Sequence, residues 1–166
     1  MPVEEGKAAP LFTLKDQHGE KVALKDFRGR DVIVYFYPKD DTPGCTKEAC
    51  GFRDHWKQLH KTDTVVLGIS PDDAQAHSRF IEKYKLPFSL LSDPDKKVMA
   101  KYGAWGEKMM YGKKVIGVIR STVWIDPKGK VVKHWRKVPR AADHPDKVLQ
   151  AMQQAWQGIK STRSAK

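Results

Sequence analysis

Short apolar runs alternate along the chain with segments in which apolar residues recur at helical spacing. The runs at 31–37, 65–70 and 88–91 are nearly continuous, which is typical of buried strands. In the segments 43–61 and 71–84, apolar residues return every three to four positions, and each segment is predicted to be an amphipathic helix. Strands that alternate with helices in this way indicate an α/β protein.

Shorter elements precede and follow this alternation. Residues 11–14 and 22–24 flank a Gly-containing turn and are predicted to pair as a β-hairpin. A short helix should follow Asp93-Pro94-Asp95, and strands at 118–125 and 130–135 should form a second hairpin.

The end of the chain completes the predicted fold. Residues 103–117 carry glycines and lysines without a clear period, so a loop is predicted there. A helix over 143–159 should be the last element. This order favours a three-layer α/β sandwich with a mixed central sheet. At 166 residues the chain is expected to form one domain over 1–160, followed by a polar tail at 161–166.

A polar loop with two prolines and a glycine follows the strand at 31–37, and the predicted helix that begins after it carries Cys45 in its first turn. Backbone N–H groups in a first turn have no intrahelical acceptor, and the helix dipole favours negative charge there. Such a position lowers the pKa of a cysteine and favours the reactive thiolate. Cys50, the chain's second cysteine, lies five residues further on.

The loop carries a recognisable motif. Pro38, Thr42 and Cys45 fit the pattern P-x-x-x-T-x-x-C. This motif resembles the active-site loop of the peroxiredoxins, and the second cysteine at C-x4-C is similar to that of the bacterioferritin comigratory protein, or peroxiredoxin Q, group. The resemblance covers nearly the whole chain and includes 9–12, 68–72, 105–108, 111–113, 120–122 and 125–126. Val123-Trp124 departs from the Phe and Leu more usual in the family, which affects packing alone.

The resemblance implies a thioredoxin-like fold and a thiol-dependent peroxidase that reduces hydrogen peroxide and organic hydroperoxides without a cofactor or a metal. Cys45 would be the nucleophile. Thr42 and Arg120 would direct a hydroxyl and a guanidinium at the thiolate and the peroxide. The backbone N–H groups of Gly44 and Cys45 would add donors, and Pro38 would shield the sulfur from solvent.

Each of these residues also has a structural interpretation. A cysteine is often a small buried apolar residue, and Thr42 could be a turn or cap residue. Arg120, in a predicted apolar strand, needs a partner if it is buried. Glu48 could provide that partner alongside the catalytic role of Arg120. Gly44 could simply mark the end of a loop.

Cys50 is the candidate resolving cysteine, which would condense with a Cys45 sulfenic acid to form a disulfide. Residues five apart in a regular helix have Cα atoms roughly 8.6 Å apart, whereas a disulfide requires less than about 7 Å. The helix must therefore unwind locally when the bond forms. The alternative is that Cys50 packs in the core and an outside thiol resolves Cys45. A thioredoxin or glutaredoxin-like dithiol would return the electrons, and a pair within one helix favours a monomer.

Charge raises a competing interpretation. Residues 1–83 carry 13 Lys or Arg against 14 Asp or Glu, a net −1, whereas residues 84–166 carry 18 against 6, a net +12. Such asymmetry can indicate nucleic-acid binding, but the lysines are scattered and no aromatic–basic motif appears. No specific nucleic-acid partner is therefore expected. A disulfide exchanger is disfavoured because C-x4-C replaces the usual C-x-x-C.

Composition also bears on location. The first six residues show neither a basic region nor an apolar signal core. No apolar run approaches the roughly 20 residues of a membrane span. We therefore expect a cytoplasmic protein that does not associate with membranes.

Overall fold

The computed structural model describes residues 3–164, with side chains described as far as Trp156. Seven strands form one mixed sheet, in the order β2-β1-β5-β4-β3-β8-β9. Strands β3, β4 and β5 are parallel to one another, and the remaining pairings are antiparallel. The strand bounds are β1 Thr13–Lys15, β2 Lys21–Ala23, β3 Val32–Phe36, β4 Val65–Ser70, β5 Ser89–Ser92, β8 Ser121–Ile125 and β9 Val131–Trp135.

The central strand β3 is buried on both faces because all five of its residues are β-branched or aromatic. Its alternating side chains point to opposite faces of the sheet. Ile33 and Tyr35 join one hydrophobic core, whereas Val32, Val34 and Phe36 join the other. The sheet therefore separates two cores, which is the arrangement of a three-layer sandwich.

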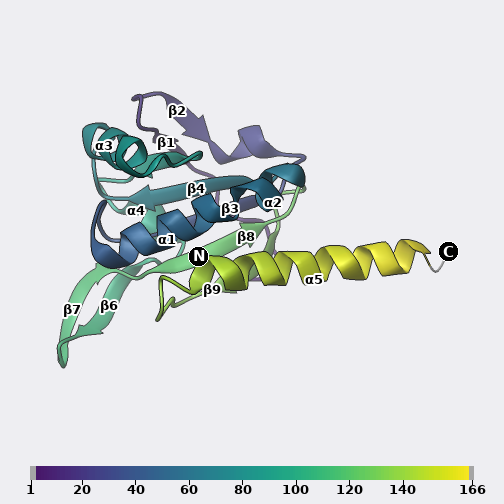
Figure 1. Cartoon of the computed structure of the whole chain (residues 1–166). Helices are drawn as coiled ribbons and strands as arrows, with labels where there is room; N and C mark the ends of the chain where they lie inside the picture. The colour runs from purple at the N-terminus through teal and green to yellow at the C-terminus, as the bar shows by residue number, and fades with distance from the viewer. Residues whose placement is uncertain (1–2, 165–166) are drawn as a thin grey trace.

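Helices cover both faces, and most of them lie on one side (Figure 1). Residues of α1 Pro43–Asp54, α2 Trp56–Lys61, α3 Ala74–Tyr84 and α5 His144–Ser164 pack in the core that contains Tyr35. The short α4, Lys97–Lys101, packs in the opposite core, and a 3₁₀ turn spans Leu24–Phe27. The predicted α/β sandwich with a mixed sheet is confirmed. No helix within residues 3–164 is both long and apolar enough to cross a membrane.

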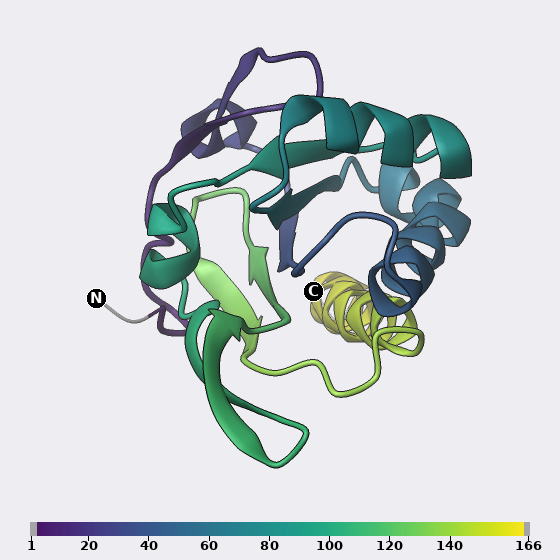
Figure 2. The same ribbon diagram turned by 90° about the vertical axis from the view of Figure 1, so that its left-hand side faces the viewer.

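The predicted loop at 103–117 is wrong. Strands β6 Trp105–Met110 and β7 Lys113–Val118 pair there as an antiparallel hairpin that projects from the body of the molecule (Figure 2). Tyr111 and Gly112 at its tip have φ values of 52° and 78°. Two consecutive positive φ values are typical of a type I′ turn. Most of the hairpin's side chains are partly or fully exposed, so it lacks the apolar alternation that marks a half-buried strand.

Three element boundaries also differ from the prediction. The predicted helix at 43–61 breaks at His55 into α1 and α2. The predicted strand at 118–125 is interrupted, because Val118 ends β7 and Ser121 begins β8. The last helix continues to Ser164, past the predicted end at residue 159. Part of the predicted polar tail at 161–166 is therefore helical, and residues 165–166 lie outside the described residues.

Candidate active site

Cys45 lies in the first turn of α1, directly after the loop that leaves the central strand. Thr42 is the N-cap residue with extended backbone, and Pro43 occupies the start of the helix, where its missing N–H costs no hydrogen bond. The N–H groups of Gly44 and Cys45 fall in the turn that lacks intrahelical acceptors, and no side chain of the described residues caps them. They are available to an oxygen or a thiolate. Cys45 itself is 1% exposed.

Arg120 connects Cys45 to Glu48. Its Nη2 donates to the Cys45 Sγ at 3.1 Å, and its Nη1 donates to the Glu48 Oε1 at 2.8 Å. The residue lies between β7 and β8, not within the predicted apolar strand, and its carbonyl accepts from the Val138 N–H at 3.0 Å. A break between two strands thus directs the guanidinium at the start of α1.

Glu48 is fully buried, and the ion pair with Arg120 stabilises the charged form of its carboxyl. Burial raises the pKa of the Glu48 carboxyl to about 7, against the opposing effect of the Arg120 charge and hydrogen bond. Burial also acts to lower the pKa of Arg120, but the negative charges of Glu48 and Cys45 outweigh it and raise that pKa overall. The guanidinium therefore stays charged between two acidic groups.

The loop residues lie around this bridge. A Cβ added at Gly44 would lie 3.3 Å from the Arg120 Nη2, so the absence of a side chain leaves room for the guanidinium. The Thr42 hydroxyl donates to the Lys39 carbonyl at 2.9 Å, and no hydrogen bond joins it to Cys45 in the described part of the chain. The turn role of Thr42 is therefore visible, while its predicted contact with the sulfur is not formed in this state.

A cleft of about 510 Å³ leads to the guanidinium. Pro38 and Arg120 line it together with residues of the β6–β7 hairpin, including Met109 and Met110. The sequence predicts Pro38 and Arg120 at the site, but it does not predict that the β6–β7 hairpin lines one side of the cleft. The exposed Met109-Met110 pair beside a Tyr-Gly turn was the one signal in the sequence that could have indicated it.

Cys50 lies on the same helix as Cys45 and is half-buried. Burial raises the pKa of its thiol, Arg53 acts to lower it and Asp54 acts to raise it. Both cysteines are free thiols within an intact α1. The separation of their Cα atoms is then that of an ideal helix, roughly 8.6 Å, and no disulfide can join them in this conformation.

Residues 6–134, which include Cys45, Cys50, Glu48 and Arg120, match the AhpC/TSA family. The chain belongs to this family. The putative peroxiredoxin bcp of Coxiella burnetii is 54% identical over 138 residues, covering 83% of this chain and 91% of that protein. Peroxiredoxin Bcp of Bacillus subtilis is 45% identical and covers 92% of this chain and 96% of that protein.

Solved structures agree with the sequence matches. The bacterioferritin comigratory protein of Xanthomonas campestris superimposes with a TM-score of 0.81 at 38% identity, covering 87% of this chain and 91% of that chain. A cysteine-to-serine mutant of Xylella fastidiosa PrxQ superimposes with a TM-score of 0.85 at 30% identity, covering 92% and 97%. This AhpC/TSA protein is accordingly a thiol-dependent peroxidase of the peroxiredoxin Bcp and PrxQ group, with a thioredoxin fold, and its substrates are peroxides.

Proposed function

We propose that this peroxiredoxin reduces hydrogen peroxide and organic hydroperoxides through Cys45, with Cys50 as the resolving cysteine. The observation that carries the proposal is the guanidinium of Arg120, held between the Cys45 sulfur and the Glu48 carboxylate. A cation at hydrogen-bond distance stabilises a thiolate and can donate to a peroxide oxygen that approaches the sulfur.

In the first step the Cys45 thiolate attacks one peroxide oxygen. The S–O bond forms as the O–O bond breaks, and the departing oxygen takes the electron pair and a proton to leave as water or an alcohol. The free N–H groups of Gly44 and Cys45 and the Nη2 of Arg120 are the donors that would stabilise the developing negative charge. Cys45 becomes a sulfenic acid.

In the second step the Cys50 thiol attacks the Cys45 sulfur, and water leaves as the disulfide forms. A dithiol of the thioredoxin or glutaredoxin class then donates two electrons and two protons and restores both thiols. The open cleft beside Arg120 leaves room for the alkyl group of an organic hydroperoxide. The bacterioferritin comigratory protein of Xanthomonas campestris, whose fold this chain shares, has alkyl peroxide reduction activity.

Two cysteines on one helix need no second subunit, so the proposal includes a monomer. Antioxidant defence in the cytoplasm follows as the expected role and stays a prediction.

Single-turnover experiments on two serine variants test the assignment of the cysteines. Cys45→Ser should fold and consume no peroxide. Cys50→Ser should reduce about one equivalent of peroxide and stop as a sulfenic acid, which mass spectrometry detects after trapping with dimedone. Turnover by Cys45→Ser would overturn the nucleophile assignment, and wild-type turnover by Cys50→Ser with thioredoxin would overturn the resolving role.

A further inference from the structure

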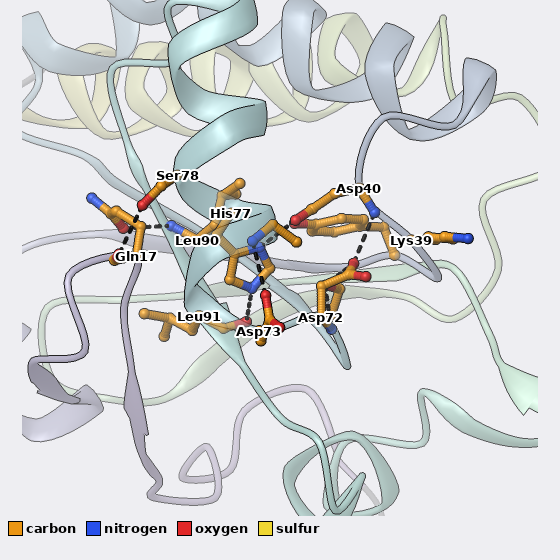
Figure 3. Close-up of polar contacts among 12 residues, drawn as sticks. Gln17, Lys39, Asp40, Asp72, Asp73, His77, Ser78, Leu90 and Leu91 are labelled. Atoms are coloured by element: carbon orange, nitrogen blue, oxygen red, sulfur yellow. Dashed lines mark hydrogen bonds and ion pairs between the residues drawn. The ribbon is translucent and has the colours of Figure 1, made fainter.

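A buried polar cluster fixes the loop between β3 and α1. It consists of Tyr37, Asp40, Ser70, Asp72 and His77, and we call it the loop anchor. The side chains of Asp40 and His77 are 5% and 0% exposed. Figure 3 shows His77 reaching from α3 toward Asp40 in the loop on one side and toward the β5 backbone on the other. The cluster lies outside the bridge of Arg120, Glu48 and Cys45.

Both ring nitrogens of His77 face acceptors. Nδ1 lies 2.6 Å from the Asp40 Oδ2, and Nε2 lies 3.1 Å from the Leu91 carbonyl oxygen. A neutral imidazole has a single N–H. A hydrogen bond in each contact therefore requires a proton in each, carried by the imidazolium or shared with the Asp40 carboxyl. The pair as a unit then has no net charge, which makes its burial tolerable.

Asp40 makes two further hydrogen bonds, one through its side chain and one through its backbone. Its carboxylate accepts from the Tyr37 hydroxyl at 2.5 Å, and its N–H donates to the Asp72 Oδ2 at 2.8 Å. That Asp72 oxygen accepts a second hydrogen bond from the Ser70 hydroxyl at 2.7 Å. Asp40 is thus bonded to the imidazole and to Tyr37, and Asp72 to Ser70 and the Asp40 backbone, so the cluster connects the loop to strand β4 and helix α3.

The next residue along the chain, Asp41, makes a second set of contacts between the loop and α3. Asp41 has a φ of 58°, and its carboxylate accepts from the Lys83 ammonium and the Tyr84 hydroxyl at 2.8 Å each. Near the other end of α1, the Arg53 guanidinium donates to the Tyr84 carbonyl at 2.7 Å. The Cys45–Cys50 segment therefore lies between contacts to α3 on both sides.

We propose that Asp40 and His77 are a positioning pair for the peroxidatic reaction, which keeps the loop at 38–42 in place while α1 unwinds and refolds between turnovers. The inference rests on the proposed function, because unwinding follows from disulfide formation between Cys45 and Cys50. The loop carries Pro38 at the cleft and leads directly into Gly44, which lies against Arg120 at the start of α1. When this loop stays fixed, the refolding helix starts from the same position in each turnover. Cys45 then returns directly to its hydrogen bond with the Arg120 guanidinium.

Removing the imidazole tests the pair. His77→Leu leaves the buried Asp40 charge without its partner, so the loop should shift. The second-order rate constant for hydrogen peroxide, from stopped-flow tryptophan fluorescence, should fall about tenfold or more, since small misplacements at a reacting centre have large effects on rate. Amide exchange over 38–42 in the dithiol form should accelerate, while exchange in α5 should not.

Charge removal should rescue the variant. In the double variant Asp40→Asn with His77→Leu, the amide at position 40 needs no counter-charge, so the peroxide rate constant should recover most of the loss. Asp40→Asn alone should react within about threefold of wild type, because the new amide can donate to a neutral imidazole. A purely space-filling role of His77 predicts no rescue.

Tyr102→Phe is the matched control. It removes another buried hydrogen bond, the one from the Tyr102 hydroxyl to the Pro10 carbonyl, in the opposite core. Its peroxide rate constant should stay at the wild-type value.

If His77→Leu does not fold, His77→Gln replaces it, since the amide donates to Asp40 but cannot supply both contacts.

Two results would overturn the positioning pair: a wild-type rate constant in the His77 variants, or a double variant no faster than the single one. A wild-type protein inert toward peroxide would instead overturn the proposed function.

Discussion

At the scale of single residues, the active site depends on one side chain with two hydrogen-bond directions. Arg120 reaches the Cys45 sulfur with Nη2 and the Glu48 carboxylate with Nη1. The planar fork of a guanidinium holds both directions at once, whereas the ammonium of lysine is a compact charge on a flexible stem. Charge and geometry can therefore be separated by a single substitution.

Arg120→Lys should slow the reaction of Cys45 with hydrogen peroxide by about 10²-fold, the effect of losing one well-aimed donor at a reacting oxygen. Stopped-flow fluorescence under single-turnover conditions measures the rate constant. Arg28→Lys is the control, because the Arg28 guanidinium contacts the exposed Lys128 carbonyl instead. An unchanged rate constant in Arg120→Lys would leave the arginine as a structural partner of Glu48.

At the scale of elements, the sequence predicted those parts that depend on local pattern. Strand β3, helix α3 and the Cys45 position follow from apolar runs, helical spacing and a Pro-Gly loop. The bridge from Arg120 to Glu48 could be anticipated because a buried arginine needs an acidic partner. These features are visible within short windows of the chain.

The remaining parts depend on contacts between distant residues. Asp40 and His77 are 37 positions apart, and no spacing rule connects them. The β6–β7 hairpin was not predicted because its exposed strands carry lysines on both faces, so no alternating apolar pattern marks them as strands. The break at Arg120 was missed because Val118, Ile119 and Val123 make the region look like one continuous strand.

Helix α1 should lose protection when the enzyme is oxidised. Because roughly 8.6 Å between the Cys45 and Cys50 Cα atoms is too long for a disulfide, several hydrogen bonds of this helix must open. Amide exchange over 43–52 should be at least about tenfold faster in the disulfide form than in the dithiol form. Exchange in α3 serves as the internal reference. Equal protection of α1 in both forms, with the bond verified by mass, would contradict the unwinding.

Helix α5 begins with a titratable contact to the sheet. His144 is 3% exposed and its Nε2 lies 2.7 Å from the Thr122 hydroxyl. Burial lowers the pKa of His144 to about 4, and the charges of Lys147 and Arg120 act in the same direction. The folded-state pKa lies below the unfolded value, so this contribution to stability is full above about pH 6.5 and is lost as pH falls toward 4.

His144→Gln should therefore flatten the acid loss of stability. Between pH 6.5 and 4 the free energy of unfolding should fall by up to about 3 kcal/mol less than in wild type, from about 1.4 kcal/mol per pKa unit. Urea unfolding at several pH values measures this difference. Glu48 and His134 also titrate, but both remain in the variant and cancel in the comparison. The exposed His18, changed to Gln, should leave the profile unaltered, and parallel profiles for His144→Gln would refute the linkage.

At the scale of the whole molecule, charge is divided between the two halves of the sequence. Residues 1–83 carry a net −1 and residues 84–166 a net +12. The second half contributes the β6–β7 hairpin and Arg120, and the cleft is lined by three cationic residues, Lys108, Arg120 and Lys137, against one acidic residue, Glu107. The field at the active-site entrance should therefore be positive. A neutral peroxide gains little from it, whereas a reductant protein with an acidic surface would be attracted.

The reductive half-reaction should consequently depend on salt, and the oxidative one should not. Raising NaCl from about 10 mM to 150 mM shortens the Debye length from roughly 30 Å to 8 Å. Disulfide reduction by an acidic thioredoxin should slow about tenfold over this range, because steered association weakens with ionic strength. The peroxide step should change less than about twofold.

Replacing the exposed Lys113 and Lys114 of the hairpin by Gln should reproduce part of the slowing at low salt, whereas Lys21→Gln on the far edge strand β2 should not. A reductive rate that stays flat with salt would show that the positive half has no part in recruiting the reductant.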